Sequence, residues 1–138
     1  MRNILPANGY LTTLGAGLIV LDRAKLKLDT DPVTLITAGD VLPSDNSQGR
    51  SVLNSEMEIS FEAAVPFGVL NAELVAHRAR ADLIRMLLSV AKRVVPGRGS
   101  LLITGSTIDS AVDTKGTPFT LAQVTARAGL TETYSLAE

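Results

Sequence analysis

Polar and apolar residues alternate along the segment that follows Arg50. Its apolar side holds Met57, Ile59, Phe61, Ala63 and Val65, and its polar side holds Glu56, Glu58, Ser60 and Glu62. A period of two is typical of a strand that buries one face and leaves the other to solvent. The pattern therefore predicts a long amphipathic strand that ends at Pro66.

The next pattern predicts one long helix, from about Ala72 to Arg93, with Asn71 as N-cap and Pro96-Gly97 beyond its end. Its apolar residues form two stripes. The first stripe holds Leu70, Leu74, Ala81, Ile84, Leu88 and Ala91, and the second stripe holds Val75, Ala79, Leu83, Met86 and Val90. A helix that is apolar over most of its circumference is normally covered on two sides.

We expect a sheet to cover one side of this helix and either the N-terminal segment or a neighbouring subunit to cover the other. We favour the neighbouring subunit, because little else in the chain is predicted to be helical. The predicted subunit contacts are Val75, Ala79, Leu83 and Met86, with Arg78 and Arg85 from the narrow polar sector.

Shorter patterns predict further strands over residues 17–28, 33–37, 101–108 and 119–134, and an extended, turn-rich segment over residues 1–15. Residues 39–50 are rich in Gly, Pro, Ser, Asn and Asp, which predicts a loop. Two interpretations of this loop stay open: a solvated hairpin connection, or a mobile docking element. The docking candidates are Asp40, Leu42, Asp45, Asn46 and Arg50.

Composition narrows the classes of function. The chain has 138 residues, which usually means one domain, and a formal net charge of −1, which gives no bulk attraction to nucleic acid. It has no cysteine, so disulfides and thiolate metal sites are excluded. No apolar run reaches the roughly 20 residues that span a bilayer, and the N-terminus is a poor signal peptide, so no membrane partner is expected.

Candidate chemistry is sparse. His77 is the only histidine, and no nucleophile or orienting carboxylate lies at a recognisable spacing, so we interpret it as a packed histidine or one at the rim of a packed surface. Glu56, Glu58 and Glu62 share one strand face, where neighbouring carboxylates two residues apart lie roughly 7 Å from each other. They could bind a cation or act as acid and base, but we favour a solvated or channel-facing surface. We expect no catalytic residue, no metal and no cofactor.

The order of motifs resembles that of the tail terminator proteins of long-tailed bacteriophages, also called tail-completion or minor tail proteins. The resemblance covers most of the chain. It rests on Ala7 to Gly15 (ANGYLTTLG), Pro32 to Ile36, the polar loop, the strand ending at Val65-Pro66, the helix with Asn71, His77 and Ala81-Asp82-Leu83, and the closing strand from Val124 to Tyr134.

The resemblance implies a single α+β domain over residues 1–138, with a mostly antiparallel or mixed sheet and one long helix packed on one face. It implies a structural virion protein of the tail neck region, not an enzyme, that is assembled in the host cytoplasm into a ring, expected to be hexameric. Such a ring ends tail-tube polymerisation and joins the tail to the head connector or head-completion protein. DNA would only pass through its channel, and Glu56, Glu58 and Glu62 facing inward would repel phosphate.

Two alternatives remain open from the sequence. One is another phage neck or tail ring protein, such as a head-completion or tube subunit, which would share the same assembly physics. The other is a small enzyme that uses the Glu56, Glu58 and Glu62 face.

Overall fold

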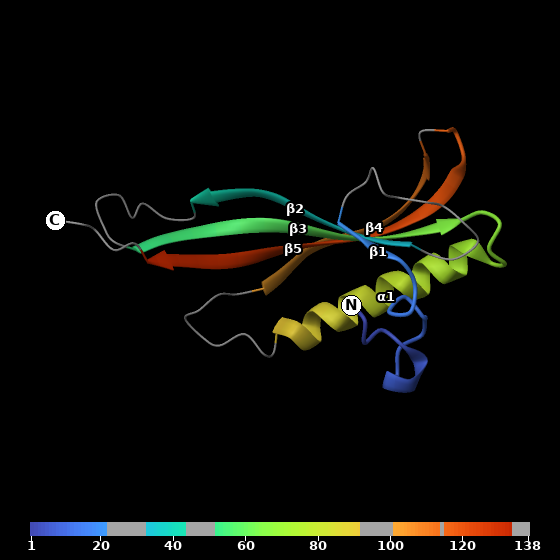
Figure 1. Cartoon of the computed structure of the whole chain (residues 1–138), viewed down its shortest axis with the longest axis horizontal. Coiled ribbons are helices and arrows are strands. Elements are labelled where there is room, and N and C mark those ends of the chain that lie inside the picture. The colour runs from blue at the N-terminus through green and yellow to red at the C-terminus, as the bar shows by residue number, and fades with distance from the viewer. Residues whose placement is uncertain (22–32, 44–51, 92–100, 114, 134–138) are drawn as a thin grey trace.

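The computed structural model describes residues 1–21, 33–43, 52–91, 101–113 and 115–133 (Figure 1). In chain order the elements are a short 3-10 helix (Pro6–Asn8), β1 (Ile19–Val20), β2 (Val33–Pro43), β3 (Val52–Pro66), α1 (Ala72–Ala91), β4 (Leu101–Val112) and β5 (Pro118–Thr133).

The strands form one sheet in the order β1-β2-β3-β5-β4. β1 runs parallel to β2, and the other neighbouring pairs are antiparallel. α1 connects β3 to β4, which are not neighbours in the sheet. The last strand, β5, lies between them and pairs with both. The α+β fold expected from the sequence, with one long helix packed on a mostly antiparallel sheet, is confirmed.

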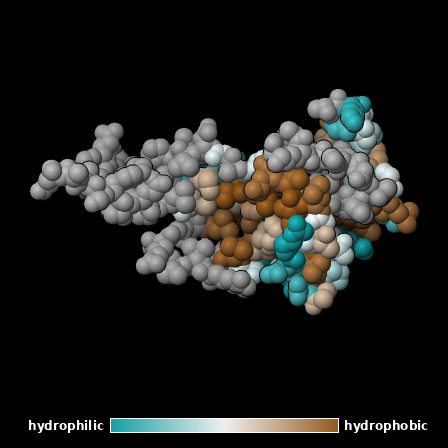
Figure 2. All heavy atoms as spheres, viewed as in Figure 1, coloured by the Kyte–Doolittle hydropathy of each residue, from teal (hydrophilic) through white to brown (hydrophobic). Residues whose placement is uncertain are grey.

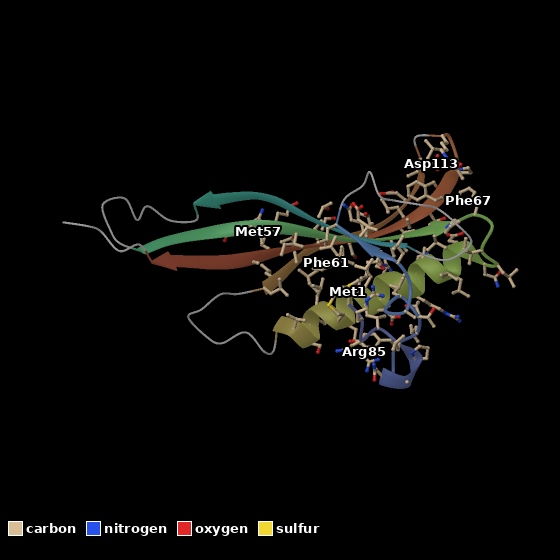
Figure 3. All side chains as sticks on the ribbon, viewed as in Figure 1. Met1, Met57, Phe61, Phe67, Arg85 and Asp113 are labelled. Atoms are coloured by element: carbon tan, nitrogen blue, oxygen red, sulfur yellow. The ribbon has the colours of Figure 1, made fainter. Side chains whose placement is uncertain are left out.

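Helix α1 packs on one face of the sheet, and the period-two pattern of β3 decides which side chains it meets. Phe61 and Ala63 face α1, and their register partners on β5, Val124 and Ala122, lie beside them on the same face. Figure 3 shows Phe61 and Met1 between the sheet and the helix. In Figure 2 hydrophobic side chains gather where α1 meets the strands.

The sheet is longer than the helix. In Figure 1 the paired ends of β2, β3 and β5 project past the C-terminal end of α1 as an arm. β3 pairs with β5 without interruption from Val52 to Pro66, so the arm continues the same ladder that forms the core. Met57, near the base of this arm, is half-buried.

Two predicted boundaries need correction. The loop predicted from residue 39 does not begin there, because β2 continues to Pro43. Residues 44–51 lie outside the described residues. The register of β2 against β3 shifts between Ala38 and Val41, so Gly39 and Asp40 occupy a bulge instead of a turn. Of the strand predicted over 17–28, the described part forms strand only at Ile19–Val20, and residues 22–28 lie outside the described residues.

The turn between the two C-terminal strands begins later than predicted, because β4 extends to Val112 instead of ending near Ile108. Asp113 organises the turn: its Oδ1 accepts hydrogen bonds from the backbone N–H groups of Lys115 and Thr117, each at 2.8 Å. Gly116 supplies the left-handed backbone, with φ of 79°. The turn keeps β4 and β5 in the register that places Ile108 beside Ala122.

Candidate functional site

The N-terminal segment is fastened to helix α1 through Asp82. This carboxylate is only 1% exposed. It accepts hydrogen bonds from the backbone N–H of Leu11 at 2.9 and 3.1 Å, from the N–H of Thr12 at 2.7 Å and from the hydroxyl of Thr12 at 2.6 Å. A buried carboxylate is tolerated where several donors replace its hydration. Asp82 therefore serves as a fixed anchor for the chain around residue 11.

Arg85, one turn further along α1, holds the same segment. Its guanidinium donates to the carbonyl oxygen of Gly9 and lies over the ring of Tyr10, 5.0 Å from the centroid. Gly9 has a φ of 80°, which favours glycine at this position. In Figure 3 the Arg85 side chain lies beside the N-terminal segment. The side of α1 that carries Asp82 and Arg85 is thus covered by the chain's own N-terminus.

Contacts within the N-terminal segment keep it compact. The N–H of Gly15 donates to the carbonyl of Ile4 at 2.9 Å, and the guanidinium of Arg2 donates to the carbonyls of Gly15 and Gly17 at 3.0 and 2.8 Å. Ile4 and Leu14 are buried in the main core. Of the two covers that the sequence left open for the helix, the N-terminal segment covers the flank that carries Asp82 and Arg85. A neighbouring subunit on the rest of the helix surface stays a prediction.

The residues predicted as subunit contacts lie inside the chain. Ala79 and Leu83 are fully buried, Met86 is 8% exposed, and Val75 packs half-buried against the same core. They meet the sheet, so they are not available to a second subunit. The physical reason is that the second stripe, not the first, faces β3, β4 and β5. Val90, at the end of that stripe, is exposed.

The first stripe lies on the opposite side of α1 and is largely open to solvent. Leu70, Leu74 and Leu88 are 85%, 47% and 52% exposed, Ala81 is exposed and Ile84 is half-buried. His77 is exposed within the same stripe. From Leu74 to Leu88 the stripe residues and His77 follow one another at alternating intervals of three and four, the spacing of a helix seam that packs against a partner.

Arginines border the first stripe. Arg78 is exposed on one side and Arg80 is half-buried on the other. Arg85 is exposed as well, but its guanidinium is engaged with Gly9 and Tyr10. The predicted contact Arg78 thus lies beside a solvent-exposed apolar stripe, although not beside the stripe that the sequence suggested.

The acidic face of β3 divides into two environments. Glu56 and Glu58 are exposed. Glu62 is 2% exposed, and its Oε1 accepts a hydrogen bond from Nε2 of Gln123 at 3.0 Å. Glu62 therefore cannot line a channel, which corrects that prediction, whereas a channel position for Glu56 and Glu58 stays a prediction. The three carboxylates do not form one cluster, and among the described residues no group of three or more acidic or histidine side chains could hold a metal ion.

The register places further side chains beside Glu58. Arg127 on β5 is its direct partner, and Leu102 on β4 is in turn the partner of Arg127. Leu102 is 65% exposed. We call the surface formed by Glu56, Glu58, Arg127 and Leu102 the outer sheet face, because it lies on the side of the sheet away from α1.

The predicted docking residues of the 39–50 segment are only partly placed. Asp40 and Leu42 belong to β2, so they sit on a strand and not in a loop. Asp45, Asn46 and Arg50 lie outside the described residues. The docking hypothesis for these three residues stays a prediction.

Sequence reasoning missed the N-terminal anchor formed by Asp82, Arg85 and Tyr10. No local signal in the sequence distinguishes a solvated aspartate from one, such as Asp82, that meets a segment 70 residues earlier in the chain. Two features of the sequence hinted at this anchor: the N-terminal segment is rich in turn residues such as Asn8-Gly9, and the polar sector of the helix is too narrow for a face that is left free.

No protein-family model matches the chain, and no curated protein matches its sequence. Within the described residues, no helix has both the length and the apolar character needed to cross a membrane.

Proposed function

We propose that this protein is a structural ring subunit of a bacteriophage tail, acting as the tail terminator at the head-proximal end of the tail tube. In this role it stops tube polymerisation and joins the tube to the head connector or head-completion protein. The resemblance of its motifs to tail terminator proteins suggests the role, and the α+β fold is compatible with it.

The observation that carries the proposal is the exposed first stripe of α1. Leu74 and Leu88 lie on the side away from the chain's own sheet, although burying each such side chain is worth about 1.5–3 kcal/mol. Contiguous exposed apolar residues with polar borders are typical of interaction sites. A subunit of a ring has a reason to keep such a stripe open, because a second protein covers it after assembly.

The distribution of surfaces supports a ring in preference to a two-fold dimer. The exposed stripe of α1 and the outer sheet face lie on opposite sides of the same sheet. Contacts between unlike surfaces join subunits head to tail, and such contacts close into rings when the rotation between subunits allows. The hexameric count comes from the resemblance alone.

Two measurements test the proposal. Negative-stain images of the purified chain should show closed rings, and native mass spectrometry should give one dominant oligomer. Added to polymerising tail-tube protein from the same phage, the rings should cap one tube end and shorten the tubes in proportion to the amount added. A chain that stays monomeric at micromolar concentration, or that leaves tube length unchanged, would refute the proposal.

The same exposed stripe would serve another neck or tail ring protein, such as a head-completion or tube subunit. The tube assay separates the three. A terminator binds one end and stops growth, a tube subunit is incorporated along the length, and a head-completion protein binds connectors but not tubes.

A further inference from the structure

We infer that the first stripe of α1 docks onto the outer sheet face of a second copy of this chain, with Arg78 and Arg80 placed against Glu56 and Glu58 of that copy. The inference rests on the proposed ring, because it names the two surfaces through which neighbouring subunits would meet.

The apolar part of the helix surface is continuous. Leu74, Ala81 and Leu88 repeat every seven residues on α1, so they cover about 21 Å of its length. The positions between them, His77 and Ile84, complete the seam. The exposure of both leucines shows that the chain's own sheet and N-terminal segment leave this side open.

Charge decides what can cover the stripe. On α1, the described charges outside the buried Asp82 are Glu73 in the first turn and Arg78, Arg80 and Arg85 after it. Pairing two copies of α1 through this stripe would bring arginines together along its middle, which is unfavourable. A surface that carries negative charge would complement the arginines on both borders of the stripe.

The chain itself offers such a surface on the opposite side of its sheet. Among the described, exposed charges of that side, Glu56, Glu58 and Asp109 are negative and Arg127 is positive. The glutamates stand roughly 7 Å apart along β3, and Leu102 provides an exposed apolar side chain in the same row as Glu58. Leucines of α1 can pack on Leu102 while the arginines on either side reach the carboxylates.

The arrangement also explains why both surfaces stay exposed in one copy. They lie on opposite sides of a single sheet, so neither can reach the other within the chain. If every copy makes this contact, the helix of each copy packs on the sheet of the next. Such a contact joins two different surfaces, as the contacts in a ring do.

The first experiment removes the apolar seam. Leu74→Glu combined with Leu88→Glu should weaken self-association of the full chain at least about tenfold, measured by sedimentation velocity, because buried apolar anchors dominate interface energetics. Leu11→Glu is the matched control, because Leu11 is 60% exposed but lies on the N-terminal segment. Circular dichroism should show both proteins folded. Assembly of the double variant as in the wild type would overturn the inference.

The second experiment exchanges charge between the two surfaces. Arg78→Glu with Arg80→Glu gives one variant, and Glu56→Arg with Glu58→Arg gives another. Each alone should stay monomeric because like charges then face each other. Mixed in equal amounts, they should recover an oligomer of alternating composition with an even number of subunits, visible by native mass spectrometry.

The outcomes separate this inference from the proposed function. Rings that persist in both charge variants, or a mixture that fails to recover assembly, overturn the contact while leaving the ring in place. Rings that persist in the Glu56→Arg, Glu58→Arg variant are expected if these two residues line the channel instead. A wild-type chain that never assembles overturns the ring and the contact together.

Discussion

The two apolar stripes of α1 are similar in composition but differ completely in their surroundings. The second stripe places Ala79, Leu83 and Met86 against the sheet, where they are buried. The first stripe leaves Leu74 and Leu88 about half exposed on the other side. Apolar character therefore does not by itself determine which face of a helix forms the core, since either stripe could have packed on the sheet.

The polar residues next to each stripe account for the difference. Asp82, which borders the second stripe, and Arg85, one turn further along, both meet hydrogen-bond partners of the N-terminal segment, which covers that flank of the helix. Arg78 and Arg80 border the first stripe, whose leucines Leu74 and Leu88 stay about half exposed. A rotation that buried the first stripe would take Asp82 away from the N–H groups of Leu11 and Thr12. The anchor thus selects one orientation of the helix.

The largest expected effect comes from shortening one leucine on each side of α1. Leu83→Ala should lower the free energy of unfolding by about 2–5 kcal/mol, because a fully buried side chain leaves a cavity. Leu88→Ala, the same change on the first stripe, should alter it by less than about 0.5 kcal/mol in the monomer. Urea unfolding at a concentration where the chain is monomeric measures both. Equal losses would contradict the distinction between the stripes.

The sequence predicted the elements well where periodicity was long and unbroken. β3, α1 and β5 appear within a few residues of their expected bounds, and both stripes exist as predicted. Periodicity could not say which stripe faces the sheet, because the deciding contact joins Asp82 to Thr12, far apart in the chain. The misassignment of Leu83 and Met86 as subunit contacts follows from that missing information.

The acidic strand shows a second limit of the sequence. Alternation correctly placed Glu56, Glu58 and Glu62 on the face away from α1. It could not predict that Glu62 would be buried, because burial depends on what covers each part of a face, and its hydrogen-bond partner Gln123 comes from another strand. Likewise Gly39 and Asp40 resemble turn residues, but the ladder with β3 absorbs them as a bulge.

The N-terminal cover can be tested at Gly15. A Cβ built there would lie 2.3 Å from the carbonyl oxygen of Arg2 and 2.9 Å from that of Ile4, and both are backbone atoms. Gly15→Ala should therefore cost roughly 1–3 kcal/mol of unfolding free energy. Gly68→Ala is the matched control, because a Cβ there has nothing within 4 Å. If both variants unfold at the same urea concentration as the wild type, the segment is not packed as described.

Asp82→Asn tests the anchor without changing its size. The amide keeps one acceptor oxygen but points a donor at the N–H groups of Leu11 and Thr12, so one of them loses its partner. The expected cost is about 1–3 kcal/mol. Hydrogen exchange should speed up at the amides of Leu11 and Thr12 before it does at Leu83. Exchange that rises uniformly over α1 would indicate a helix defect and not a released segment.

The smallest expected effect is at Arg85. Arg85→Ala removes the hydrogen bond to the Gly9 carbonyl and the cation–π contact with Tyr10 on an exposed side of the molecule, for a loss of about 0.5–1 kcal/mol. Arg78→Ala removes the same charge from a residue beside the first stripe, so the stability of the monomer should change by less than about 0.5 kcal/mol. Assembly should respond in the opposite order, with Arg78→Ala weakening self-association more than Arg85→Ala. Sedimentation measures the loss of self-association of the two variants, and urea unfolding measures their loss of stability. If the same variant showed the larger loss in both measurements, the two arginines would not have the separate roles described.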